Sequence, residues 1–218
     1  MDIIYFLLHL LKDPLTTLQD FLTHYEMLTY VILAVIIFVE TGLIVMPLLP
    51  GDSLLFAVGL LAASTGKLDI QLVIPLLIGA ALLGDNVNHF VGKNFSRFIK
   101  SREQILFFKH EYLTQTEAFY EKHGGKAVIM ARFVPVVRTI APFVAGAGSM
   151  KYSTYIVYCI IGATLWVSSI TLAGYFLGSN EWVKLNFEKI VLGIVFVSVM
   201  PMMWQFARLK WLKQPESI

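Results

Sequence analysis

The sequence predicts an all-α polytopic membrane protein in which two opposed re-entrant hairpins pack among transmembrane helices. Of its 218 residues, 57% are hydrophobic and only 15% are charged, and the mean hydropathy is +0.71. A soluble domain carries about 25% charged residues. Apolar runs long enough to cross a bilayer alternate with apolar runs that are interrupted by proline, glycine and charged residues. The net charge of +2 is too small to indicate a nucleic-acid partner.

Residues 1–26 form an N-terminal segment that we expect to lie at the membrane interface. They begin with MDIIYFLLHLLKDP, which has an acid at position 2, no basic stretch and no A-x-A site. This pattern does not match a cleaved signal peptide. The apolar run is also too short to cross a hydrocarbon core of about 30 Å, so an interfacial helix is expected.

The membrane domain is expected over residues 27–180 and begins with a span, a re-entrant segment and a second span. Residues 27–46 supply 20 mostly apolar positions, enough for one crossing. The apolar run that follows is too short to cross and comes directly after the helix-breaking sequence PLLPG. We therefore predict a re-entrant hairpin over about 47–63 and a crossing over 70–92.

A polar segment over residues 93–126 leads to a second broken segment, and its last part is expected to form an interfacial amphipathic helix. Residues 127–148 are long enough to cross, but they contain two arginines, two prolines and two glycines. We predict a second re-entrant hairpin there. Residues 153–178 and 190–207 are uninterrupted spans, and the C-terminal part, 181–218, holds the last span and a basic tail.

The charges of the loops predict the orientation in the membrane. The segment 93–126 holds seven Lys and Arg residues, and the positive-inside rule places it in the cytoplasm. Counting crossings from there puts both termini in the cytoplasm and makes the two hairpins enter from opposite faces. Broken segments at matching places in two halves are typical of transporters built from inverted repeats, whose sites lie near the bilayer midplane.

Four charged residues fall in these apolar segments: Glu40, Asp52, Arg132 and Arg138. Each would cost about 2.5–3.5 kcal/mol at the bilayer centre unless it is paired or hydrated. One interpretation is a structural salt-bridge cluster that holds the hairpins together. The other is a water-accessible ligand site, because arginine favours bidentate capture of phosphate or carboxylate. Glu40 and Asp52 are in that case also candidates for carrying protons.

A second polar patch lies in the sequence GDNVNHFVG. Its residues Asp85, Asn88, His89 and Gly92 fall on one helical face. Such a face either packs against a neighbouring helix through small residues and hydrogen bonds or lines the cavity of the ligand site. Asp85 and Asn88 are the candidates for lining that cavity.

No enzyme or metal signature is found in the sequence. The nucleophile-elbow, zinc-protease and P-loop patterns are absent, and no His or Cys spacing indicates a metal site. We therefore expect no enzymatic activity, no cofactor and no metal. The single cysteine, Cys159, lies in an apolar run and is expected to be a small packing residue.

Several motifs together resemble those of the DedA family in the VTT, or SNARE-associated, superfamily. They are FVETGLIVMPLLPGDSLLFAVG, GDNVNHFVGK, FYEKHGGKAVIMARFVPVVRTIAPFVAGAGSMKY and GATLWV. The resemblance implies a bacterial cytoplasmic-membrane protein with two opposed re-entrant hairpins that moves lipids between leaflets, in some members linked to proton-motive force. It further implies that Glu40, Asp52, Arg132 and Arg138 are the essential residues, whereas some members of the family lack an acid at the position of Asp85.

The expected function is therefore that of a translocase for an anionic lipid, such as undecaprenyl phosphate or a glycerophospholipid. Arg132 and Arg138 would bind the phosphate, and Glu40 and Asp52 would serve as their counter-ions and as proton carriers. A proton-coupled small-ion or drug antiporter and a structural membrane assembly factor remain alternatives. The expected partners are a phosphate-bearing lipid and protons, and a homo-oligomer is left open.

Overall fold

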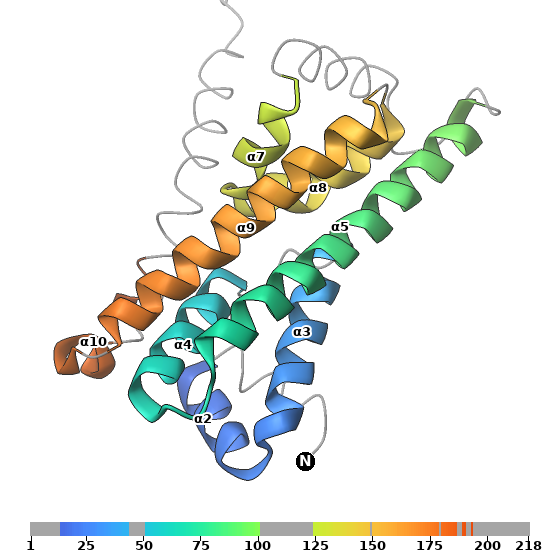
Figure 1. The fold of residues 1–218 in the computed structure, drawn as a ribbon. Helices are drawn as coiled ribbons and strands as arrows, with labels where there is room; N and C mark the ends of the chain where they lie inside the picture. The colour runs from blue at the N-terminus through green and yellow to red at the C-terminus, as the bar shows by residue number, and fades with distance from the viewer. Residues whose placement is uncertain are drawn as a thin grey trace, which may run out of the picture.

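The computed structural model describes residues 14–43, 51–100, 124–148, 150–178, 180–186, 189–190 and 193. Within these residues all regular structure is helical, as the sequence predicts (Figure 1). The interfacial helix expected in residues 1–13, the one expected before residue 124, and almost all of the expected span 190–207 and basic tail lie outside the described residues.

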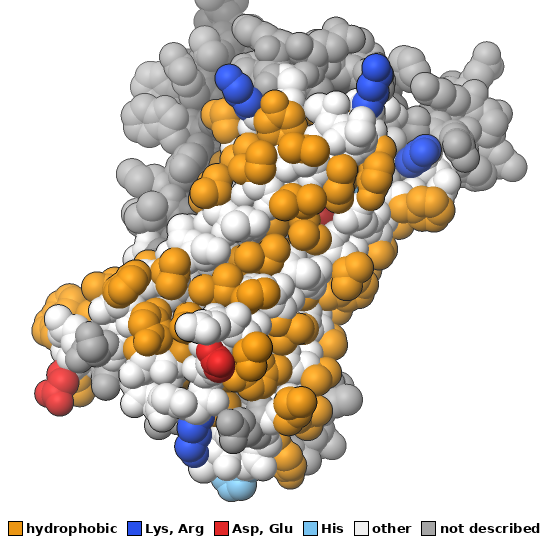
Figure 2. All heavy atoms as spheres, viewed as in Figure 1, with side chains coloured by type: hydrophobic (Ala, Val, Ile, Leu, Met, Phe, Trp, Pro, Cys, Tyr) orange, Lys and Arg blue, Asp and Glu red, His pale blue; other side chains and the backbone are white. Residues whose placement is uncertain are grey.

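Two long apolar helices cross the molecule from end to end. Helix α5 (Ile70–Lys100) has 31 residues and α9 (Tyr152–Leu177) has 26, and both are long and apolar enough to span a membrane. They confirm the helices expected over 70–92 and 153–178. Helix α5 continues beyond residue 92 because the polar sequence that follows contains no proline. Figure 2 shows apolar side chains spread over the surface of the molecule that faces the viewer.

Helices α3 (Glu26–Gly42) and α4 (Gly51–Thr65) are shorter and lie between the N-terminal region and α5. In Figure 1, α3 runs from the lower end of the molecule to its middle, and α4 begins near the middle and returns to the lower end. The main-chain N–H of Asp69 donates a 2.8 Å hydrogen bond to the Tyr30 hydroxyl. The start of α3 therefore lies beside the start of α5.

This hydrogen bond corrects the predicted crossing of residues 27–46. A crossing by that segment alone would place Tyr30 and Asp69 on opposite faces of the membrane, whereas they are in contact. The predicted combination of a crossing over 27–46 with a re-entrant segment over 47–63 is therefore wrong, because the chain returns between Tyr30 and Asp69 to the end from which it started. Length and apolarity alone do not show where such a segment turns back. The second arm, α4, is buried along most of its length.

Helices α7 (Lys126–Arg132) and α8 (Pro135–Ala147) occupy the broken segment of the second half. They are separated by only two residues, and Pro135 occupies the first turn of α8, where its missing N–H costs nothing. Figure 1 shows α7 and α8 at the upper end of the molecule, opposite the α2–α4 end. A break in this segment is thus confirmed, and the structure places it at residues 133–134, between the two arginines.

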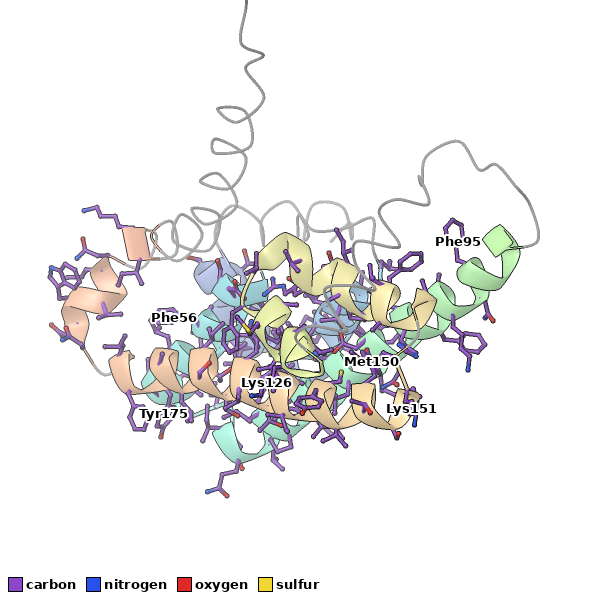
Figure 3. The ribbon with its side chains drawn as sticks, turned by 90° about the horizontal axis from the view of Figure 1, so that it is seen from above. Phe56, Phe95, Lys126, Met150, Lys151 and Tyr175 are labelled. Atoms are coloured by element: carbon purple, nitrogen blue, oxygen red, sulfur yellow. The ribbon has the colours of Figure 1, made fainter. Side chains whose placement is uncertain are left out.

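The short helices form two pairs, α3–α4 and α7–α8, and the second helix of each pair packs against the long helix that follows the other pair. Helix α4 packs along α9, and α8 packs along α5. Both contacts are made through glycines: a Cβ on Gly59 would lie 1.9 Å from the carbonyl oxygen of Thr171, and one on Gly146 would lie 2.0 Å from that of His89. Backbones this close leave no room for a side chain. Figure 3 shows Phe56 of α4 and Tyr175 of α9 on the same side of the molecule.

Helices α2 (Pro14–His24) and α10 (Glu181–Leu185) lie at the end where α4 turns into α5 (Figure 1). Leu18 and Leu22 of α2 are buried in the core beside α4. Residues 14–24 are therefore at the opposite end of the molecule from the last turns of α5 (Figure 1). The sequence analysis expected the N-terminal segment and the segment after residue 92 at one face of the membrane, whereas α2 and the last turns of α5 lie at opposite ends of the molecule.

Candidate functional site

The charged residues singled out from the sequence meet in the middle of the molecule, where the short helices end. Glu40 lies in the last turn of α3 and Asp52 in the first turn of α4. Arg132 is the last residue of α7, and Arg138 is in the first turn of α8. Glu40 is 1% exposed, and both arginines are also buried. Charges that the sequence places on separate segments are thus assembled by the fold into one buried cluster.

The guanidinium of Arg138 is held between two carboxylates. Its Nη1 lies 2.5 Å from Oδ1 of Asp52, and its Nη2 forms an ion pair with Oε1 of Glu40. The two acids come from the facing ends of α3 and α4. The predicted pairing of Glu40 and Asp52 with an arginine is confirmed, but a single arginine serves both acids.

Arg132 forms a separate ion pair with Asp85 of α5. The Sγ of Cys159 lies 3.1 Å from Oδ2 of Asp85, and the Tyr155 hydroxyl donates a 3.1 Å hydrogen bond to the Asp85 carbonyl oxygen. Asp85 was expected to lie on a helix-packing face or to line the cavity; here it is the counter-ion of an arginine. Cys159 is buried, as expected, and in addition it contacts both members of this pair.

Trp166 of α9 connects the two ion pairs, and the sequence analysis missed it. Its indole Nε1 donates a 2.8 Å hydrogen bond to Oδ1 of Asp52. Its ring centroid lies 4.7 Å from Cζ of Arg138 and 5.8 Å from Cζ of Arg132, within range of cation–π attraction. The signal in the sequence was its position: Trp166 lies in the middle of a span, whereas tryptophan in membrane proteins is enriched at the interfaces.

Gly51 makes room for the Glu40 carboxylate. A Cβ at position 51 would lie 1.9 Å from Oε2 of Glu40, so a side chain there would displace the acid. Gly51 is also the first residue of α4. The carboxylate therefore lies against the first turn of a helix, where main-chain N–H groups are unpaired within the helix and favour negative charge.

The remaining polar residues of α5 make contacts between helices. The Nδ2 of Asn88 donates to the carbonyl oxygens of Thr41 at 3.1 Å and Thr139 at 2.6 Å, joining α5 to α3 and α8. The ring of His89 stacks on Tyr155 with centroids 4.2 Å apart. These contacts match the helix-packing interpretation of this face. Among the described residues, no group of His, Cys, Asp and Glu is placed to hold a metal ion.

Comparison with known proteins places this chain in a family. The VTT domain matches residues 49–176, and the chain is 46% identical over 202 residues to Protein DedA of Escherichia coli K12, covering 92% of each chain. The chain belongs to the DedA family. It is also 47% identical to an uncharacterised membrane protein of Mycobacterium leprae, covering 77% of this chain and 74% of the relative.

Similarity extends to a further member, the inner membrane protein YqjA of Escherichia coli K12. The two are 33% identical over 159 residues, which cover 73% of this chain and 71% of YqjA. No solved structure matches the chain. Together with helices α5 and α9, these relatives identify a membrane protein of the DedA family.

Proposed function

We propose that this DedA-family protein moves an anionic lipid, such as undecaprenyl phosphate or a glycerophospholipid, between the leaflets of the bacterial inner membrane. The observation that carries the proposal is the buried Arg138, whose Nη1 and Nη2 are each bound by a different carboxylate. Two oxygens of one phosphate would engage the same two nitrogens, because a guanidinium matches phosphate in a bidentate manner.

The proposed arrangement in the membrane is two re-entrant hairpins between the long helices. Helices α3 and α4 form one hairpin, so that its bounds extend beyond the 47–63 expected from sequence, and α7 and α8 form the other. They enter from opposite faces, and their reciprocal packing on α9 and α5 supports an inverted repeat. With the basic segment after α5 in the cytoplasm, α2 is extracytoplasmic, and a cytoplasmic C-terminus remains a prediction.

The charge of the cluster supports proton coupling. Two arginines face three carboxylates, those of Glu40, Asp52 and Asp85, so the cluster carries a net charge of −1 when all of them are ionised. A buried unpaired charge costs several kcal/mol, and one bound proton would remove it. The carboxylates beside Arg138 are the proposed proton site, since Arg138 needs only one of them for neutrality.

A proposed cycle follows from this competition for Arg138. Protonation of Glu40 weakens its hold on Arg138, and the lipid phosphate then displaces both Glu40 and Asp52 from the guanidinium. Loss of the proton restores the ion pair and releases the phosphate. The lipid tail stays in the bilayer while the head group passes between the hairpin ends, where the α3–α4 and α7–α8 segments meet.

A proton-coupled antiporter for a small ion or drug is the second candidate, because the excess of buried carboxylate serves it equally well. Purified protein in liposomes separates the two functions. Fluorescent phosphatidylglycerol that becomes accessible to an external quencher reports lipid movement, and decay of an imposed pH gradient reports antiport.

We expect lipid movement by the wild type, loss of it in Arg138→Gln, and no change in the matched control Lys126→Gln. Lys126 is an exposed cation at the start of α7. A folded wild-type protein that dissipates the pH gradient without moving lipid would establish the antiporter instead. A wild type that does neither would favour an assembly factor with a structural cluster.

A further inference from the structure

An open groove of about 1070 Å³ lies between α3 and the first half of α5, away from the ion pairs. Its walls are mainly apolar and come from both helices. They include Val31, Ala34 and Val35 on α3, and Leu72 and Leu76 on α5. Most of these side chains are strongly exposed; Leu72, for example, is 63% exposed.

The groove is closed at the middle of the molecule. A Cβ on Gly42 would lie 3.3 Å from Cα of Gly84, so the backbones of α3 and α5 touch there. Toward their starts the two backbones diverge (Figure 1), and the long Tyr30 side chain spans the space to the main chain of Asp69. The lining of α5 runs from Asp69 to Leu83, about 21 Å at 1.5 Å per residue. One leaflet of a hydrocarbon core of about 30 Å is shorter than this, so the groove accommodates a full acyl chain.

Polar groups line only the outer end of the groove. The Tyr30 hydroxyl and Lys67 lie there with Asp69. Asp69 is engaged locally, because its Oδ1 accepts a 2.8 Å hydrogen bond from the main-chain N–H of Gln71 at the start of α5. The exposed Lys67 has no ion-pair partner among the described residues. An anionic group at this position would therefore meet a cation whose charge is not already paired.

We propose that this groove binds one acyl chain of a phospholipid in the leaflet at the α2 end, with the lipid phosphate at Lys67. An apolar channel of leaflet length with a cation at its outer end matches a lipid standing in that leaflet. The inner end is lined by Phe38 and Leu83, which lie two residues before Glu40 and Asp85 in the chain. Only the further statement that this lipid is the transported one rests on the proposed function.

The test uses phosphatidylglycerol carrying a photoreactive acyl chain, mixed into phosphatidylcholine vesicles that contain the full-length protein. After illumination, mass spectrometry of peptides maps the labelled residues. We expect labelling of α3 and α5 along the groove, and a several-fold reduction in Ala34→Trp, which fills it. Ala173→Trp is the matched control, because Ala173 is an exposed alanine of α9 outside the groove.

A second pair of variants tests the outer end. Lys67→Gln should reduce groove labelling by the phosphatidylglycerol probe several-fold. Labelling by a zwitterionic phosphatidylcholine probe should fall much less, because its choline already balances the charge of its phosphate. Lys151→Gln, an exposed lysine at the opposite end of the molecule, should change neither. Equal labelling of α9 and the groove, with no effect of Ala34→Trp, would overturn the proposal and show only boundary lipid.

Other results would overturn the proposal that the groove binds an acyl chain, or would separate this binding from transport. A groove found occupied by residues 1–13 or by a second copy of the chain, detected as protein–protein cross-links at Val35, would also refute the proposal. Specific groove labelling in vesicles where the wild type moves no lipid would retain the groove and reject the proposed function. Lipid movement without specific labelling would retain the proposed function and reject the groove.

Discussion

Trp166 donates its indole N–H to the same Asp52 oxygen that binds Arg138, at 2.8 Å and 2.5 Å respectively. The indole ring also covers the Arg138 guanidinium, 4.7 Å from its Cζ. Trp166 thus fixes the positions of both members of the Arg138–Asp52 ion pair, and it does so from the long helix α9. We regard it as a positioning residue of the cluster.

Replacing Trp166 with phenylalanine should lower lipid movement several-fold while the protein stays folded. The ring face over Arg138 is kept, but the hydrogen bond to Asp52, worth about 1 kcal/mol, is lost. Because Asp52 is then held less firmly, the pH dependence of transport should shift as well, which packing alone would not produce. The measurement is translocation in liposomes at several pH values, beside thermal unfolding. An unchanged pH profile would assign Trp166 to packing.

Replacing Arg138 with lysine should abolish most transport although the charge is kept. An ammonium cannot bind two carboxylates, or two phosphate oxygens, in the planar geometry of Nη1 and Nη2. Liposome translocation and folded yield measure the effect, and Lys126→Arg is the matched control. Normal transport by Arg138→Lys would show that Arg138 acts through its positive charge alone and not through the planar geometry of its guanidinium.

Replacing Glu40 with glutamine should leave a folded protein whose transport no longer responds to a pH gradient. Asp52 remains to neutralise Arg138, so the variant does not bury an unpaired cation. What is lost is the carboxylate proposed to take up the proton. Translocation is measured at imposed gradients of both signs, with the wild type alongside. A well-folded variant with the full wild-type response would remove Glu40 from the proton path.

Replacing Asp85 with asparagine should destabilise the protein by about 3–5 kcal/mol, because it leaves a buried Arg132 without its counter-ion. Stability can be measured by denaturant unfolding in detergent. The double variant with Arg132→Gln should recover most of the loss, since both charges are then removed. If the single variant proves as stable as the wild type, the Asp85–Arg132 pair does not persist in the membrane.

Cysteine labelling tests the arrangement of the ends. In a Cys159→Ser background, single cysteines at Asp20, Thr65 and Asn180 should react from the outside, and one at Ser101 only from the cytoplasm. Asp20 lies in α2, which packs at the end where α4 turns into α5. Labelling of Asp20 from the side opposite to Thr65 would contradict the α3–α4 hairpin.

The sequence by itself determined the class of the protein, its two long apolar helices and four of the five charged residues of the cluster. Apolar length, helix breakers and intramembrane charge are local properties, and their cost in a bilayer applies whatever the helices pack against. Glu40, Asp52, Arg132 and Arg138 could therefore be identified without coordinates.

Only the tertiary structure decided which charges meet and how the first hairpin is built. Asp85 pairs with Arg132, and Trp166 binds Asp52, because glycine contacts allow α5 and α9 to approach the broken helices closely. Such partners are far apart in the chain, so no local pattern specifies them. For the same reason the sequence did not show that the chain returns from Tyr30 to the start of α5, because the contact between Tyr30 and Asp69 joins residues far apart in the chain.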